Sequence, residues 1–70
     1  MFEMVMMSLR MKKGLNRHLF KHFFAIDVYD VYNKIIDEQV NKGNLLMNDD
    51  YLYCSERGFM ILNEILVEFL

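Results

Sequence analysis

The sequence has 70 residues, of which 54% are hydrophobic and 14% aromatic, and its formal net charge is −2. This balance excludes an intrinsically disordered chain, because disorder needs low hydrophobicity and high net charge. No apolar run approaches the roughly 20 residues that span a bilayer, so we predict one soluble domain over residues 1–70.

The first predicted helix covers residues 2–11, and Gly14 suits the left-handed backbone that closes a helix. The apolar stripe of this first helix has the helical i, i+3, i+4, i+7 spacing at Phe2, Val5, Met6 and Leu9. A short second helix begins after Asn16, which is a favoured N-cap residue. Its buried side is expected to contain Leu19, Phe20, Phe23 and Phe24.

The third and longest helix is predicted from Asp27 to the glycine at position 43. Asp27 is a favoured N-cap, and Asp30 is placed to reach back as in a capping box. Gly43 ends the helix. Its apolar stripe contains Val28, Val31, Tyr32, Ile35, Ile36 and Val40.

A short antiparallel hairpin follows, because the apolar period changes after Gly43. Residues 45–47 and 51–54 flank Asn48-Asp49-Asp50, a sequence suited to a tight turn. Leu52 and Cys54 are expected to face the interior.

The last helix is predicted over residues 56–70, with Ser55 as its N-cap. Gly58 lies in its first turn, where glycine costs about 1 kcal/mol relative to alanine. We therefore expect a close approach to the backbone at Gly58. The apolar positions of this helix are Phe59, Ile61, Leu62, Ile65, Leu66 and Phe69. The fold class is thus mainly α and winged-helix-like, with three helices, a short hairpin and a C-terminal helix.

Positive charge gathers in residues 10–22, which contain no acid. The basic side chains of this segment are Arg10, Lys12, Lys13, Arg17, His18, Lys21 and His22. Such a segment can bind an anionic partner, although charge runs commonly face solvent, and both interpretations stay open. The third helix and the Asp49-Asp50 turn carry the wrong sign for a DNA-binding surface.

No catalytic, cofactor-binding or metal site is predicted. His18 and His22 have the i, i+4 spacing of metal ligands, but no third ligand is evident. Cys54 is expected to be a core side chain. As the single cysteine, and in a chain without a secretory signal, it favours a reducing, cytoplasmic location.

Methionines crowd the first helix, where Met4, Met7 and Met11 occupy a face separate from the apolar stripe. Methionine surfaces adapt to partners, and a helix that is apolar on two sides needs cover on both. We expect this face to dock on another domain or on a second copy of the chain.

An ordered set of residues gives the sequence a family resemblance. The set is Leu9-Arg10, Gly14-Leu15, Phe20, Phe24, Ile26-Asp27, Tyr32, Gly43 to Leu46, Leu52, Ser55, Arg57-Gly58, Asn63 and Glu68 to Leu70. It resembles the C-terminal domain of the oxygen-independent coproporphyrinogen III oxidase family, which includes closely similar haem-chaperone proteins. Ala25 stands where that family usually has glycine, a change that is compatible with the fold if φ stays negative.

The resemblance implies a non-catalytic accessory domain of a cytoplasmic radical S-adenosylmethionine protein in haem biosynthesis. The parent would hold a four-iron four-sulfur cluster in a catalytic barrel, and this chain would pack on that barrel. The basic residues could then hold porphyrin carboxylates, and His18 or His22 could meet haem iron. The alternative is a free-standing winged-helix module that binds protein or nucleic acid through residues 10–22.

Overall fold

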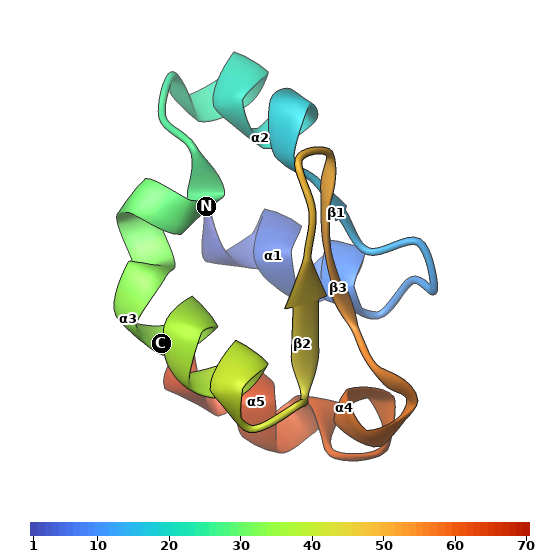
Figure 1. Cartoon of the computed structure of the whole chain (residues 1–70). Coiled ribbons are helices and arrows are strands. Elements are labelled where there is room, and N and C mark those ends of the chain that lie inside the picture. Colours follow the sequence, from blue (N-terminus) through green and yellow to red (C-terminus); the bar gives the residue numbers. More distant parts are fainter.

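The computed structural model of the chain describes residues 1–70, in which five helices pack with a small antiparallel sheet that lies at one side of the molecule (Figure 1). In chain order the elements are α1 (Phe2–Leu9), β1 (Leu15–Asn16), α2 (Arg17–Phe24), α3 (Val28–Asn41), β2 (Leu45–Met47), β3 (Tyr51–Cys54), α4 (Glu56–Met60) and α5 (Leu62–Glu68). The predicted mainly helical class, with a hairpin before the last helical segment, is confirmed.

The hairpin forms with its predicted bounds, and β3 is the central strand of a sheet with the order β1-β3-β2. The Asn48 side chain accepts hydrogen bonds from the backbone N–H groups of Asp50 and Tyr51, both at 2.8 Å, which closes the turn. The sequence analysis missed β1, where Leu15 pairs with Leu52. Gly14 has φ +85° and directs the chain onto β3, where a Cβ atom would overlap the Leu52 carbonyl oxygen.

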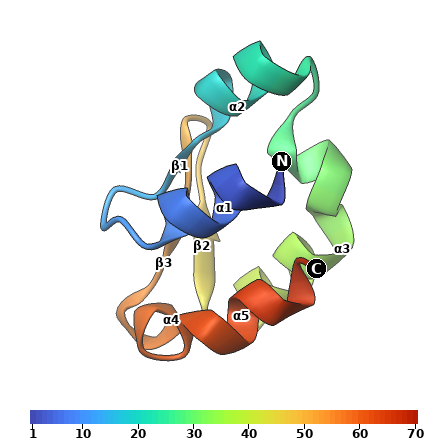
Figure 2. The ribbon, with the colours of Figure 1, turned by 180° about the vertical axis from the view of Figure 1, so that it is seen from behind.

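The core is one cluster of 13 buried apolar residues that draws on almost every element. Leu52, at the centre of the sheet, is fully buried with Leu62 in the same cluster, and Ile35 packs against it. Helix α1 lies against the sheet, behind it in Figure 1 and in front of it in Figure 2, and buries Val5 and Leu9 completely. The elements therefore close around a single apolar centre.

The three predicted N-caps are confirmed. The side chains of Asn16, Asp27 and Ser55 accept hydrogen bonds from backbone N–H groups two or three residues later, at 2.9 to 3.0 Å. The capping-box role of Asp30 is wrong, because its side chain makes no hydrogen bond to the backbone of Asp27. The Asp27 carboxylate instead accepts from the N–H of Tyr29 and pairs with Arg17.

The expected close approach at Gly58 is confirmed. A Cβ atom there would overlap the carbonyl oxygen of Asn44 and lie 2.9 Å from its carbonyl carbon. That oxygen accepts hydrogen bonds from the backbone N–H and the hydroxyl of Ser55, at 3.0 and 3.2 Å. The buried Asn44 side chain donates to Gln39 at 2.8 Å. The first turn of α4 therefore packs directly on the backbone that follows α3.

The predicted last helix is broken at Ile61, where φ is −119° and ψ is 27°. The break keeps α4 against Asn44 while α5 turns Leu62, Ile65 and Leu66 into the core. Helix α1 also ends earlier than predicted, at Leu9.

Helix α2 buries less than its sequence suggested. Phe20 is fully buried and Phe24 is half-buried, but Leu19 and Phe23 are 46% and 64% exposed. These side chains are exposed because only one side of α2 packs on β1 and α3. No element covers the opposite side of the helix (Figure 1). The following residue, Ala25, adopts the left-handed conformation with φ +60°, so the condition of a negative φ at this position is not met.

On α3, Val28 and Ile36 of the predicted stripe are buried, and Val31, Tyr32 and Ile35 pack against the core. Val40 is the exception at 39% exposure, because Gln39 turns inward to Asn44 in its place.

Candidate functional site

The described side chains form no group of three or more His, Cys, Asp or Glu residues that could hold a metal ion. None of the helices has the length and apolar character that crossing a membrane requires. Cys54 is 6% exposed, its thiol lies 3.7 Å from the Leu9 carbonyl oxygen, and burial raises its pKa. It is a core side chain, as predicted, and not an activated nucleophile.

Two of the predicted basic site residues tie α2 to its neighbours. The Arg17 guanidinium lies 2.8 Å from the Asp27 carboxylate and donates to the Asn48 carbonyl oxygen at 2.6 Å. His18 Nε2 lies 2.8 Å from a carboxylate oxygen of Asp50 in an exposed pair. Both residues thus anchor α2, through the hairpin turn and the start of α3, and a ligand would have to displace these partners.

The contact with Arg17 contributes to a lowered pKa of the Asp27 carboxyl group. Burial by itself raises the pKa of this carboxyl group, but the hydrogen bond from the Tyr29 N–H and the Arg17 guanidinium outweigh it, so the pKa is lowered. The charged form of Asp27 is therefore the form that supports the fold.

The other basic residues of the segment point to separate parts of the molecule. Lys13 Nζ lies 5.5 Å from the centre of the Tyr51 ring, on the sheet. Arg10 donates to the Asn63 side chain of α5 at 3.4 Å. His22 packs edge-on against Phe23, with the ring centres 5.5 Å apart. Lys12 is exposed and forms no ion pair.

The methionine surface is the part of the predicted docking face that the structure leaves open. We define it as Met7 and Met11, whose side chains are 67% and 64% exposed. Met4, the third predicted member, is half-buried and packs against the core, so it is not free for a partner. Two large apolar side chains thus face solvent, that of Met7 on α1 and that of Met11 two residues beyond the end of this helix.

A second apolar surface lies on α2 and the residues that follow it, and it was missed because Leu19 and Phe23 were expected to be buried. It comprises Leu19, Phe23 and Ile26, and Ile26 is 37% exposed. The signal in the sequence was present but ambiguous, since four apolar residues within six positions exceed what one side of an eight-residue helix can bury.

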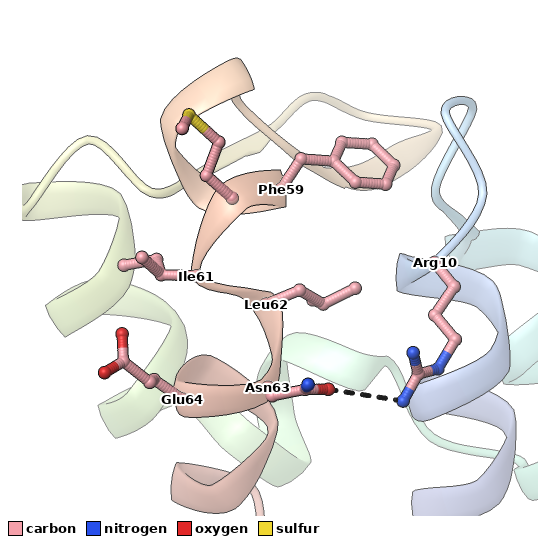
Figure 3. A pocket seen from close by; sticks show the side chains of 7 residues that line it. Arg10, Phe59, Ile61, Leu62, Asn63 and Glu64 are labelled. Carbon is pink, nitrogen blue, oxygen red and sulfur yellow. Dashed lines mark hydrogen bonds between the residues drawn. The ribbon is translucent and has the colours of Figure 1, made fainter.

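An open groove of about 580 Å³ lies between the end of α1 and the α4–α5 break (Figure 3). Its lining residues are Arg10, Phe59, Met60, Ile61, Leu62, Asn63 and Glu64. The hydrogen bond between Arg10 and Asn63 crosses it. No local sequence pattern predicts this groove, because its two walls come from residues 53 positions apart.

Comparison with known proteins adds one finding to this geometry. The family model described as the HemN C-terminal domain matches residues 1–61. No curated protein and no solved structure matches the chain. The matched range includes the methionine surface, α2 and the hairpin, whereas Asn63 and the rest of α5 lie beyond it.

Proposed function

Because the chain belongs to the HemN C-terminal domain family, that of oxygen-independent coproporphyrinogen III oxidases and their relatives, we propose that it is a non-catalytic accessory domain. It packs on the catalytic barrel of a radical S-adenosylmethionine protein of haem biosynthesis and helps to cover the tetrapyrrole site. The observation that carries this proposal is the methionine surface.

The methionine surface supports docking for two physical reasons. Met7 lies on α1, whose other side is fixed in the core by Val5 and Leu9, so the helix presents it on a rigid base. Met11 follows two residues after the end of the helix at Leu9. Methionine side chains are flexible and polarisable, which allows them to fit an uneven partner surface. Burial of this patch would remove apolar area that now contacts water.

The chain lacks the cysteine ligands that the iron–sulfur cluster of its proposed parent protein requires. An iron–sulfur cluster needs several cysteine thiolates, and this chain offers one buried cysteine, Cys54. In this proposal the catalytic barrel holds the cluster and S-adenosylmethionine. Toward a tetrapyrrole, the chain can contribute positive charge from Lys12 and Lys21, and the imidazole of His22; none of the three forms an ion pair within the domain.

The alternative, a free-standing module that binds nucleic acid, receives less support from the contacts. Two basic residues that it would use, Arg17 and His18, already contact the carboxylates of Asp27 and Asp50 and so are not available to phosphates. Because phosphate contacts supply most non-specific affinity, this loss weakens the alternative.

The test uses the catalytic part of an oxygen-independent coproporphyrinogen III oxidase that lacks its own C-terminal domain. Isothermal titration of this barrel with the chain should give a saturable complex. The double variant Met7→Asp/Met11→Asp should bind at least about tenfold more weakly, because it places charge in an apolar interface. Val67→Asp, at a 63% exposed position of α5, is the matched control and should bind as the wild type does. Absence of binding, or equal binding by all variants, would refute docking through this surface.

A further inference from the structure

We propose that the groove between Arg10 and the α4–α5 break binds an acidic side chain flanked by apolar residues on a partner polypeptide. The inference does not depend on the proposed function, because it rests on the groove itself and names no catalytic barrel. Three features carry it: an uncompensated guanidinium on one wall, and an amide and a row of apolar side chains on the other.

The side chains on one wall converge on Arg10. Figure 3 shows Phe59, Leu62 and Asn63 projecting from α4 and α5 toward the end of α1, where Arg10 lies. Glu64 is the one acid in the lining, and it points away from Arg10 together with Ile61. The side of the groove next to Arg10 is therefore apolar and carries no negative charge.

The positive charge of Arg10 is not neutralised within the chain. The ion pairs of the structure join Arg17 to Asp27, His18 to Asp50 and Lys42 to Glu38, and none includes Arg10. Its one hydrogen bond, to Asn63 Oδ1, is long at 3.4 Å and leaves its other N–H donors free. A guanidinium with free parallel N–H groups binds a carboxylate through two hydrogen bonds.

Asn63 supplies the second polar contact. Its Oδ1 atom faces Arg10, and its Nδ2 group makes no hydrogen bond within the chain. A carboxylate that reaches Arg10 would therefore meet an amide donor on the opposite wall. One guanidinium and one amide match the charge and donor needs of one carboxylate, whereas a nucleic-acid backbone would need several cations in a row.

The apolar lining of the groove favours a partner with apolar side chains on both sides of its acidic residue. Leu62 is 7% exposed and forms the floor, Phe59 is half-buried, and Met60 is 87% exposed. Apolar side chains on both sides of an acidic residue would cover Phe59 and Met60, and they would exclude water from the charged contact. Exclusion of water strengthens the attraction between the carboxylate and Arg10.

The test uses two end-capped tetrapeptides, Leu-Glu-Phe-Leu and its glutamine analogue Leu-Gln-Phe-Leu, titrated into the 15N-labelled chain. The glutamate peptide should shift the amide signals of Arg10, Leu62 and Asn63 saturably, and the glutamine peptide should bind at least about fivefold more weakly. Arg10→Gln should remove this preference. Lys12→Gln, which deletes a nearby exposed charge outside the groove, is the matched control and should keep it.

Three results would overturn the proposal: equal binding of the two peptides, signal shifts outside the groove, or loss of the preference in Lys12→Gln as well. Equally tight binding of 4-phenylbutyrate would assign the groove to small carboxylic acids and would contradict a polypeptide partner. Thermal unfolding of Arg10→Gln should match the wild type, which separates loss of the site from loss of the fold. Since none of these measurements uses a catalytic barrel, failure of the chain to bind a barrel would leave their outcome unchanged.

Discussion

Replacing Gly58 by alanine tests the packing of α4 on the backbone that follows α3. Intrinsic helix propensity predicts that alanine stabilises a helical position by about 1 kcal/mol relative to glycine. The structure predicts the opposite, because the added Cβ atom would overlap the carbonyl oxygen of Asn44. Two backbone segments would have to move apart, and neither is the flexible end of a side chain.

The expected loss of stability in Gly58→Ala depends on the contacts and hydrogen bonds of the Asn44 carbonyl oxygen. Overpacking of a closely packed site costs about 1–3 kcal/mol. The upper part of this range applies here, since the Asn44 oxygen also accepts hydrogen bonds from the N–H and hydroxyl of Ser55. After subtraction of the gain in propensity, Gly58→Ala should lower the free energy of unfolding by about 2 kcal/mol. For a domain of this size, that corresponds to a fall in Tm of about 8–16 °C.

Urea unfolding followed by far-UV circular dichroism measures this change. Gly43→Ala is the comparison, because Gly43 has φ +79° and no atom within 4 Å of the added Cβ, so its cost comes from backbone conformation alone. That cost is about 1 kcal/mol, smaller than the cost expected at Gly58. If Gly58→Ala is as stable as the wild type or more stable, the close approach of α4 to Asn44 is wrong.

Three further substitutions test local features of the fold. Ser55→Ala should lower the free energy of unfolding by about 1–2 kcal/mol, because the hydroxyl accepts a hydrogen bond from the Gly58 N–H as the cap of α4 and donates one to the Gly43 carbonyl oxygen. Ser55→Thr should retain most of the stability, and equal losses in both variants would contradict the cap. Ala25→Gly should raise the free energy of unfolding by about 1 kcal/mol, because a left-handed backbone strains alanine, and unchanged or lower stability in the same urea assay would count against that conformation. The folded-state pKa of Asp27 is lowered, so its stabilisation is complete above the unfolded-state pKa and is lost as the pH falls through the folded-state pKa. From about pH 5 to about pH 3, wild-type stability should therefore fall more steeply than that of Asp27→Asn, which keeps an N-cap but loses the charge, and parallel pH profiles would refute the pairing with Arg17.

The features that the sequence predicted correctly are governed by short-range chemistry. Asn16, Asp27 and Ser55 cap helices through bonds to N–H groups two or three residues away. The hairpin turn is similarly local, because the Asn48 side chain itself closes it. Such bonds depend on few neighbours, so residue type and position are enough to predict them.

Several features that it missed or predicted wrongly depend on distant parts of the chain. Strand β1 is two residues long and exists because Leu15 meets Leu52, so no period of its own could reveal it. The break at Ile61 arises because α4 is held at Asn44 while α5 packs in the core. The exposure of Phe23 likewise depends on which elements reach α2.

The same distinction applies to the candidate sites. Helical spacing placed Met7 and Met11 on a face away from the core, and both are exposed, but spacing alone could not show that Met4 packs inward. The groove joins Arg10 to Asn63 across 53 positions, so it appears only once the chain is folded.

Mapping the contact on the 15N-labelled chain tests the docking claim most directly. On addition of the catalytic barrel of an oxygen-independent coproporphyrinogen III oxidase, the amide signals of Met7 and Met11 should broaden most. Signals from Leu46 and Tyr53, on the outer face of the sheet, should change least. Broadening centred on the sheet, or spectra that the barrel leaves unchanged, would contradict an accessory domain that docks through the methionine surface.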